Sequence, residues 1–428
     1  MLVNDKVRRV AIIGGARIPF ARGMGAYADV GNQEMLTAAL AGLVARCQLD
    51  GVRIGEVAGG AVMKHSSQWN LVREAVLGTA LAPETPAFDL QRACGTSLEA
   101  AILLGNKIAL GQIDSGIACG VDTVSDAPIV YARPYQQLLL ESARGRTLGA
   151  RLKPWLRLRP SFFRPVAPSV NEPRTGLSMG QACEQMAQSW HIARAAQDAL
   201  ALESHQRAAA AYAAGFYRDL VVPYHGLSAD NNLRPDSTLV QLAKLKPVFD
   251  RSEKGTLTAG NSTPLTDGAA SVLLASEDWA RARGLPVQAL LTYGKAHAVD
   301  FIRKEGLLMA PAYAVPMMLK DARLGLGDFD YYEIHEAFAA QVLCTLAAWE
   351  SADFCRDRLG LAAPLGAIDR AKLNVVGSSL AVGHPFAATG ARIVATLAKL
   401  LAERGGRRGL ISVCTAGGMG VTAILERA

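Results

Sequence analysis

One arrangement occurs twice in the sequence: a glycine-containing loop with a reactive side chain, then a helical pattern, then a short apolar strand. The first loop carries Cys94 and the second carries His384. The predicted helix–strand pairs span 98–110 with 117–121, and 388–401 with 410–413. Alternating helices and strands are typical of α/β folds. A duplicated α/β half, with a large insertion in the first copy, explains both occurrences.

The remaining hydrophobic pattern predicts further elements on both sides of a break in this alternation. Strands are predicted at 9–14, 87–90 and 288–293, and helices at 35–45, 179–190, 194–216 and 339–349. A proline-rich, basic stretch from 128 to 173 interrupts the pattern. Half of the 428 residues are hydrophobic and 19% are charged, so the chain can bury a large core. No apolar run approaches the ~18–20 residues that cross a bilayer.

The cysteine usage and the chain ends point to a reducing compartment. The seven cysteines form no CxxC pair and follow no signal peptide, so neither a disulfide framework nor a metal site is expected. A strand-like run begins at Val7, which leaves no room for a cleavable presequence. The last residues, 426–428, are not a peroxisomal address. We therefore expect a cytoplasmic protein.

The formal charge of +7 is concentrated in the segment 141–174. Its basic residues are Arg144, Arg146, Arg151, Lys153, Arg157, Arg159, Arg164 and Arg174, opposed only by Glu141 and Glu172. Leucine, tryptophan and phenylalanine residues alternate with them. Since no nucleic-acid-binding module surrounds the segment, nucleic acid is not an expected partner. A partner subunit or an anionic membrane surface would attract such a segment, and a solvated loop with scattered arginines is the alternative.

Three residues could carry covalent or acid–base chemistry. Cys94 follows a predicted strand and opens a helix, whose N-terminus favours the thiolate. His384, between glycine and proline, suits a general base near neutral pH. Cys414 ends a buried strand in a glycine-rich turn whose backbone amides could form an anion-binding nest. Taken singly, each could instead be an inert cysteine or a histidine satisfied within its loop.

Several common motifs are absent. The sequence His335-Glu336-Ala337-Phe338 is not the zinc motif HExxH, because Ala339 stands where that motif needs histidine, and the polar pair could simply cap a helix. The glycines at 14–15 lack the GxGxxG spacing of dinucleotide-binding folds. No GxSxG surrounds Ser378 and Ser379, which disfavours a serine hydrolase.

The set of motifs, in this chain order, closely resembles the thiolase family. The family's nucleophilic-cysteine, N/H-E-A-F, G-H-P and C-x-G-G-G motifs match the regions of Cys94, His335, His384 and Cys414, and the stretches 178–180, 258–262 and 267–270 match as well. The resemblance covers essentially the whole chain. It implies the thiolase fold, in which two duplicated βαβαβαββ halves form a layered α-β-α-β-α core. The implied domains are 1–125 with 256–283, an inserted loop domain at 126–255, and a C-terminal half at 284–428.

The resemblance also implies thiolytic cleavage of 3-ketoacyl-CoA by CoA in fatty-acid degradation. Cys94 would be the acylated nucleophile, and His384 would take its proton and help to bind the thioester oxyanion. Cys414 would protonate the acetyl-CoA carbanion and then deprotonate the incoming CoA. His335 would hold a water or itself donate at the first oxyanion site. The backbone N–H groups of Cys94 and Ala416 would form the second, and Ala416 keeps this N–H although it replaces a usual glycine.

The family's ligand contacts, carried across, would line the CoA pantetheine channel with Ser178, Met179, Ala259, Thr263, Ala337 and Phe338. CoA is then a substrate, and no bound cofactor is expected. Thiolases generally assemble as dimers or tetramers. His335 and the basic insertion are similar to the thiolase (β) subunits of fatty-acid oxidation complexes, whose partner is a hydratase/dehydrogenase α subunit. The alternatives are an acetoacetyl-CoA thiolase working in synthesis, a more distant decarboxylating ketoacyl synthase, and a non-catalytic thiolase-fold subunit.

Overall fold

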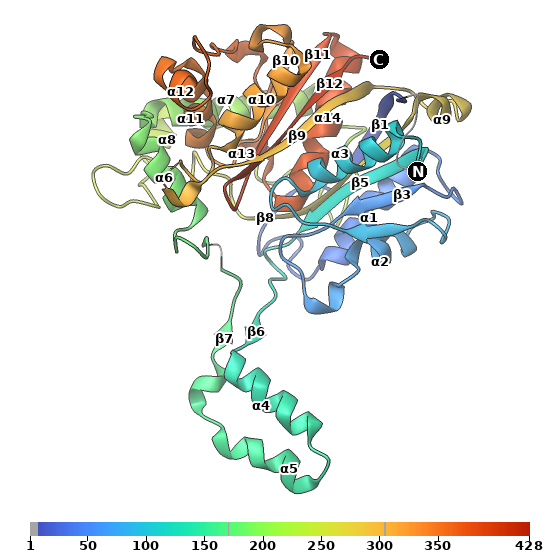
Figure 1. The fold of residues 1–428 in the computed structure, drawn as a ribbon, viewed down its shortest axis with the longest axis vertical. Coiled ribbons are helices and arrows are strands. Elements are labelled where there is room, and N and C mark those ends of the chain that lie inside the picture. Colours follow the sequence, from blue (N-terminus) through green and yellow to red (C-terminus); the bar gives the residue numbers. More distant parts are fainter. Residues whose placement is uncertain (1–6, 170, 304) are drawn as a thin grey trace.

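The computed structural model describes residues 7–169, 171–303 and 305–428 (Figure 1). The N-terminal half contains five strands of the central sheet and three helices. These are β1 (Val10–Arg17), α1 (Asn32–Arg46), β3 (Glu56–Gly59), α2 (Leu71–Leu77), β4 (Ala87–Asp89), α3 (Thr96–Ala109), β5 (Ser115–Asp122) and β8 (Thr266–Ser276). The short β2 (Ala21–Arg22) pairs with β8.

The C-terminal half follows through α9 (Glu277–Ala282) and repeats the same order of elements. Its strands are β9 (Ala289–Ala298), β10 (Tyr331–Ile334), β11 (Arg408–Thr415) and β12 (Met419–Glu426). Its helices are α10 (Ala310–Ala322), α11 (Ala339–Glu350), α12 (Ala352–Asp357), α13 (Ser379–Val382) and α14 (Thr389–Arg404). The predicted helices and strands of both halves are found within a few residues of their expected ends.

The strand orders of the two halves match, which confirms the predicted duplication. The first half runs β4-β3-β5-β8-β1, with β8 antiparallel to β5 and β1 antiparallel to β8. The second runs β10-β11-β12-β9 with the equivalent directions, and Leu373 pairs parallel with Tyr332 where β4 lies in the first half. The two halves join through two residue pairs between β1 and β9.

Helices form three layers around these strands, so the predicted α-β-α-β-α order is confirmed. The helices α3 and α14 pack on each other between the halves, and their apolar residues share one core cluster with both sets of strands. The outer face of the first half is covered by α1 and α2. The outer face of the second half is covered by α10 and α11. The loops that precede α3 and α14 carry Cys94 and His384, so this middle layer brings the two loops together.

The insertion lies between β5 and β8. Its helices α6 (Met179–Ser189) and α7 (Arg194–Ala213) pack on α11, and α7 also packs on α13, whereas α8 (Leu239–Ala243) packs on α7. An insertion that leaves from the first half therefore covers part of the second. The proposed limits of the inserted domain, 126–255, remain a prediction.

The basic segment forms an arm that projects from the body (Figure 1). Its neck is a two-stranded ribbon of β6 (Val130–Tyr131) and β7 (Pro165–Val166). Its tip carries α4 (Arg133–Arg144), α5 (Leu148–Leu152) and two short 3₁₀ helices, at 153–157 and 160–163. The segment therefore forms helices rather than an irregular loop. Pro134 lies in the first turn of α4, where proline starts a helix rather than breaking it.

No helix within the described ranges combines the length and apolar character needed to cross a membrane.

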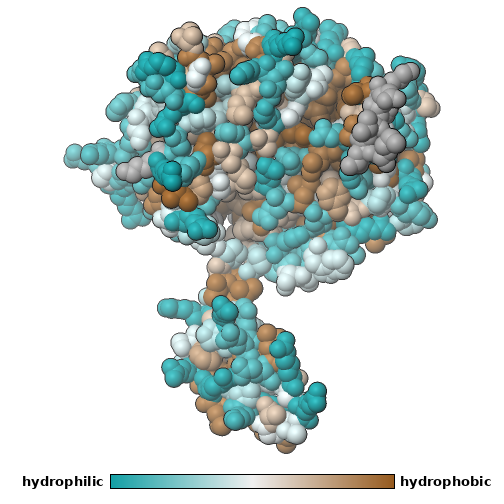
Figure 2. Space-filling model, viewed as in Figure 1, coloured by the Kyte–Doolittle hydropathy of each residue, from teal (hydrophilic) through white to brown (hydrophobic). Residues whose placement is uncertain are grey.

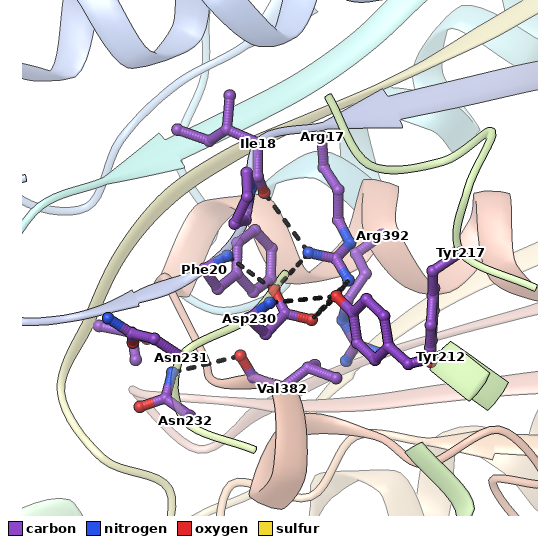
Figure 3. A network of polar contacts seen from close by, with 12 residues as sticks. Arg17, Ile18, Phe20, Tyr212, Tyr217, Asp230, Asn231, Asn232, Val382 and Arg392 are labelled. Atoms are coloured by element: carbon purple, nitrogen blue, oxygen red, sulfur yellow. Dashed lines mark hydrogen bonds and ion pairs between the residues drawn. The ribbon is translucent and has the colours of Figure 1, made fainter. Parts of the chain in front are cut away.

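A buried polar network ties the insertion to the first half (Figure 3). Arg17 of β1 donates to both carboxylate oxygens of Asp230, at 2.5 and 2.7 Å. Asp230 also accepts the Tyr212 hydroxyl and the Phe20 backbone N–H. Both charges are buried, but the additional hydrogen bonds offset the loss of hydration. Next to Asp230, the Asn232 amide donates to the last carbonyl of α13.

Candidate active site

Cys94 lies in a tight turn between β4 and α3. Ala93 adopts a left-handed conformation with φ of 44°, and its carbonyl accepts the Thr96 hydroxyl. The Arg92 N–H in turn donates to the Thr96 hydroxyl oxygen. Gly95 allows β12 to approach closely, because a Cβ at that position would lie 2.8 Å from a Val421 methyl. The turn is therefore fixed from both sides and presents the thiol between the halves.

His384 reaches the Cys94 thiol from the loop before α14. Its Nε2 lies 3.2 Å from the Cys94 Sγ, and its Nδ1 lies 2.6 Å from the Thr389 hydroxyl. Its backbone N–H donates to the Thr266 hydroxyl on β8. Gly383, with φ of 105°, supplies the conformation that this loop needs. With its proton on Nδ1, the imidazole presents the Nε2 lone pair to the thiol.

Cys414 comes to the same thiol from the end of β11. It is 2% exposed, and it is close enough to Cys94 for the two sulfur charges to interact. The following turn uses left-handed Gly417 and Gly418, with φ of 77° and 69°, whereas Ala416 needs no such conformation. The N–H groups of Ala416 and of Cys94 itself both donate toward the Cys94 sulfur. The structure thus brings together Cys94, His384, Cys414 and both backbone groups of the predicted second oxyanion site.

His335, at the end of β10, completes the cluster. Its ring centroid lies 4.1 Å from that of His384. Its Nδ1 lies 2.8 Å from the Ser379 hydroxyl, whereas its Nε2 has no hydrogen-bond partner among the described residues although it is buried. A buried nitrogen without a partner is costly unless a ligand or water meets it. This nitrogen is therefore available to a substrate atom.

The electrostatics of the site contradict the expected Cys94 thiolate. Burial raises the pKa of Cys94 to about 12, more than the Ala416 and Cys94 N–H groups lower it. Burial also raises the pKa of Cys414 well above its usual value and lowers that of His384 to about 3. The pKa of His335 is lowered well below the ordinary value by burial, then by His384 and Arg392. The resting pair is therefore a neutral thiol and a neutral imidazole.

Four of the six predicted CoA-channel residues lie where two stretches of the chain, 259–263 and 337–338, contact each other. Ala259 lines a cavity of about 520 Å³, to which Arg22 and Arg234 also contribute. The Thr263 N–H and hydroxyl both donate to the Ala337 carbonyl, at 3.1 and 3.0 Å. Phe338 pairs with Ser262, which also lines the cavity. Together these contacts join the start of α11 to the cavity wall.

The other two lie at the start of α6, away from that cavity. Ser178 caps α6 by accepting the Gln181 N–H, and it is not among the residues that line the cavity. Met179 packs against the apolar cluster that contains Phe338 and Cys414.

Within the described residues, one group of potential metal ligands is compact enough to hold an ion. The ligand atoms of Cys94, His335 and His384 all lie within 4.8 Å of one another. Sulfur and imidazole ligands of this kind suit zinc, and three ligands would leave one position open. The sequence predicted no metal site.

Sequence reasoning missed the residues that orient His335. Ser379 was considered only for a serine-hydrolase motif, and Arg392 of α14 was not singled out. The Glu336 carboxylate, next to His335, accepts hydrogen bonds from Ser204, Asn374 and the Leu380 N–H. These partners come from distant segments, so no local spacing in the sequence marks them.

The chain matches known proteins along its whole length. The family description "Thiolase, N-terminal domain" matches residues 10–278, and "Thiolase, C-terminal domain" matches residues 288–427. The 3-ketoacyl-CoA thiolases of Yersinia pestis (strain Pestoides F) and Yersinia pseudotuberculosis (serotype O:1b) are each 42% identical over 431 residues, which cover 99% of this chain and 98% of the relative.

Two solved structures share the fold. The acetyl-CoA acetyltransferase of Bacillus anthracis superposes with a TM-score of 0.81 at 29% identity, covering 99% of this chain and 100% of the other. Human mitochondrial 3-ketoacyl-CoA thiolase gives a TM-score of 0.79 at 28% identity, covering 98% and 99%.

Proposed function

The chain belongs to the thiolase family, and on this premise we propose that it is a 3-ketoacyl-CoA thiolase of fatty-acid β-oxidation. The observation that carries the proposal is the Cys94 thiol, 3.2 Å from the His384 Nε2 and next to Cys414. A nucleophile, its base and a second acid–base group are the parts that carbon–carbon cleavage of a ketoacyl thioester requires.

In the first half-reaction, the Cys94 sulfur attacks the ketone carbon of the 3-ketoacyl-CoA while His384 takes the thiol proton. The Ala416 and Cys94 N–H groups donate to the resulting oxyanion. The bond between the ketone carbon and the neighbouring methylene then breaks, leaving the acyl group on Cys94. The departing acetyl-CoA enolate, its oxygen held by the two histidines, takes a proton from Cys414.

In the second half-reaction, the Cys414 thiolate takes the proton of an incoming CoA thiol. The CoA sulfur attacks the acyl-Cys94 carbonyl, and the second oxyanion site again holds the negative oxygen. Collapse of this intermediate releases the shortened acyl-CoA, and Cys94 recovers its proton from His384. The burial of His384 and Cys414 supports this order of steps, because a neutral imidazole can accept a proton and a neutral thiol can donate one.

A cavity beside the Cys414 turn favours substrates longer than acetoacetyl-CoA. It has a volume of about 480 Å³. Its apolar lining consists of Leu177, Ala182, Met186, Trp190, Phe301, Ile302 and Leu307, and its polar lining of Thr175, Gln185, Gln188, Ser189 and Glu305. Phe301 lies against the turn, since a Cβ on Gly418 would lie 2.5 Å from its ring. Ala182, Met186 and Leu307 share an apolar cluster with Cys414. An acyl tail leaving the site can thus lie along the apolar side of this cavity.

Acylation across a series of chain lengths tests the proposal. The enzyme is mixed briefly with 3-ketoacyl-CoA thioesters of increasing acyl-chain length, and the mass of the intact protein is measured by mass spectrometry. We expect acyl-Cys94 from the long substrates as well as from acetoacetyl-CoA, and none in Cys94→Ala. Labelling confined to acetoacetyl-CoA would favour an acetoacetyl-CoA thiolase, and no labelling at all would favour a non-catalytic subunit.

We further propose that the arm binds an anionic phospholipid surface. Leu148 and Leu156 are 74% and 89% exposed at its tip. Figure 2 shows hydrophobic and hydrophilic residues interspersed over the arm. On its described part, the only ion pair joins Arg157 to Glu141, which leaves the other cations without a carboxylate partner. Exposed leucines beside unneutralised arginines fit lipid tails beside acidic headgroups.

Vesicle sedimentation tests this assignment. The protein should sediment with phosphatidylglycerol vesicles more than with phosphatidylcholine vesicles, and less at high salt. The double variant Leu148→Asp/Leu156→Asp should stay in the supernatant while keeping its thiolase activity. If the wild-type protein sediments with neither kind of vesicle but binds a hydratase/dehydrogenase subunit through the arm, the partner is a protein instead.

We propose a cytoplasmic homo-oligomer, a dimer or a tetramer of the chain. All seven cysteines are free, which suits a reducing compartment. The strand β4 has no further strand on its outer side among the described residues, and the 77% exposed Trp69 directly precedes α2, which packs on β4. An open edge with an exposed aromatic neighbour suits a second copy. Light scattering after size exclusion would give the number of copies.

A further inference from the structure

A chain of two hydrogen bonds leads from α14 to the catalytic cluster. Arg392 Nη2 lies 2.8 Å from the Ser379 hydroxyl oxygen, and this oxygen lies 2.8 Å from the His335 Nδ1. The three side chains are buried, with exposures of 3%, 0% and 0%. The other ring nitrogen of His335, Nε2, has no partner in the described part of the chain.

The direction of these bonds follows from donor and acceptor counting. A guanidinium can only donate, so the Ser379 oxygen accepts from Arg392. Ser379 keeps one hydroxyl hydrogen, and within the described residues the only other group it meets is the His335 Nδ1. If Nδ1 carried a proton, that hydroxyl hydrogen would be buried without an acceptor. Both hydrogen-bonding roles of the Ser379 hydroxyl are satisfied only when it donates to an unprotonated Nδ1.

We propose that Arg392, acting through Ser379, is a positioning residue that holds His335 in the tautomer with its proton on Nε2. This inference rests on the proposed thiolase function, because the Nε2 proton is what His335 offers to the enolate oxygen. Neutral histidine otherwise exchanges between two tautomers, and only this tautomer makes the unpartnered Nε2 a hydrogen-bond donor. The Arg392 side chain lies beside Arg17 and Tyr217 (Figure 3) and interacts electrostatically with both.

The same helix sets the opposite tautomer in the neighbouring histidine. Thr389 meets the Nδ1 of His384 and lies three positions before Arg392, on the same face of α14. The Thr389 hydroxyl can donate to the Pro385 carbonyl, 3.5 Å away, while accepting the Nδ1 proton of His384. His384 then offers a lone pair to the thiol, and His335 offers a proton to the oxyanion. One turn of α14 therefore assigns different roles to two imidazoles that are 4.1 Å apart.

Ser379→Ala tests the proposal, and Ser378→Ala is its matched control. Ser378 also contacts Arg392, at 3.3 Å, but its hydroxyl does not reach His335. The ring ¹⁵N shifts of His335 are measured in histidine-labelled protein, assigned by their loss in His335→Asn. Wild type and Ser378→Ala should show a protonated Nε2 and a bare Nδ1. In Ser379→Ala the two shifts should move toward each other as the tautomers mix.

Kinetics supply the second readout. Ser379→Ala should lower kcat about two- to tenfold with KM nearly unchanged, because the donor tautomer then makes up only part of the His335 population, whereas complete loss of an oxyanion donor costs about 10²–10³ in rate. Ser379→Thr, which keeps the hydroxyl, should restore both kcat and the shifts. Unchanged ring shifts in Ser379→Ala, or an equal loss in Ser378→Ala, would overturn the proposal. The shifts need no turnover, so they report on the tautomer even if the proposed activity is wrong.

Discussion

His384 Nε2 and Cys94 Sγ lie 3.2 Å apart although 290 positions separate them in the chain. Each belongs to a different half of the duplicated fold, and each stands in the loop that leads into one of the two middle-layer helices. The nucleophile and its base therefore meet only when α3 and α14 pack together. This dependence links the chemistry of the site directly to the packing of the core.

Loss of the His335 imidazole should slow turnover without unfolding the protein. His335→Ala removes one donor to the enolate oxygen, and we expect kcat to fall about 10²–10³-fold. His335→Asn, which keeps a donor, should lose less. Steady-state kinetics together with thermal unfolding measure both effects. Near-normal turnover in His335→Ala would exclude this residue from the oxyanion site.

The half-buried Cys94 thiol should show no thiolate plateau at neutral pH. Burial places its pKa at about 12, so the thiolate fraction should rise about tenfold per pH unit up to pH 10. The rate of iodoacetamide alkylation should follow this rise. The measurement is made in the wild-type protein, in which the resting thiol and imidazole are both neutral. A plateau below pH 8 would instead support an activated thiolate.

Glu333 should make the protein less stable as the pH rises. Burial raises its pKa from 4.5 to about 8, so folding takes up a proton between these values. The unfolded chain then binds fewer protons than the folded one, and the free energy of unfolding should fall by about 1.4 kcal/mol per pH unit from this group. Urea unfolding of wild type and Glu333→Gln at pH 5.5, 6.5 and 7.5 compares the slopes. Equal slopes would contradict the burial effect.

Zinc should inhibit the enzyme by occupying its catalytic groups. Cys94, His335 and His384 present their ligand atoms within 4.8 Å of one another. We expect inhibition by Zn²⁺, reversed by EDTA, and none by Mg²⁺, which prefers oxygen ligands. His335→Asn should be inhibited less, because an amide is a poor zinc ligand. Equal inhibition of that variant would place the ion elsewhere.

Filling the cavity beside the Cys414 turn should restrict the enzyme to substrates with short acyl chains. Gln185 is exposed and lines this cavity, so Gln185→Trp can occupy it without disturbing the core. We expect kcat/KM to fall for 3-ketoacyl-CoA substrates with long tails and to stay unchanged for acetoacetyl-CoA. The short substrate thus serves as the internal control. An equal loss for both would show that the tail lies elsewhere.

The catalytic cluster could be predicted because its members occupy recognisable motifs. Cys94, His384 and Cys414 each lie where a strand or loop meets a helix or a glycine turn, and such places are visible in local sequence. The repeated helix–strand pattern also revealed the duplication. The order of the sheet strands could not be read from this pattern, because it depends on contacts between distant segments.

Other features depend on tertiary structure alone. The pKa of Cys94 follows from burial between two halves, which outweighs the helix terminus that the sequence suggested. The Ser379–Arg392 pair acts through contacts across the fold, and neither residue belongs to a motif. The proline-rich stretch 128–173 indicates an interruption of the helix–strand alternation, but its prolines do not reveal the helices of the arm, since Pro134 begins a helix.

The narrow neck of the arm separates two kinds of evolutionary change. In this neck, two residues of β6 pair with two residues of β7, and Figure 1 shows the tip projecting away from the body. Lengthening, trimming or exchanging the tip would leave the reacting sulfur and imidazole groups untouched. Natural selection can therefore change the exposed surface of the arm without retuning how the catalyst breaks a carbon–carbon bond.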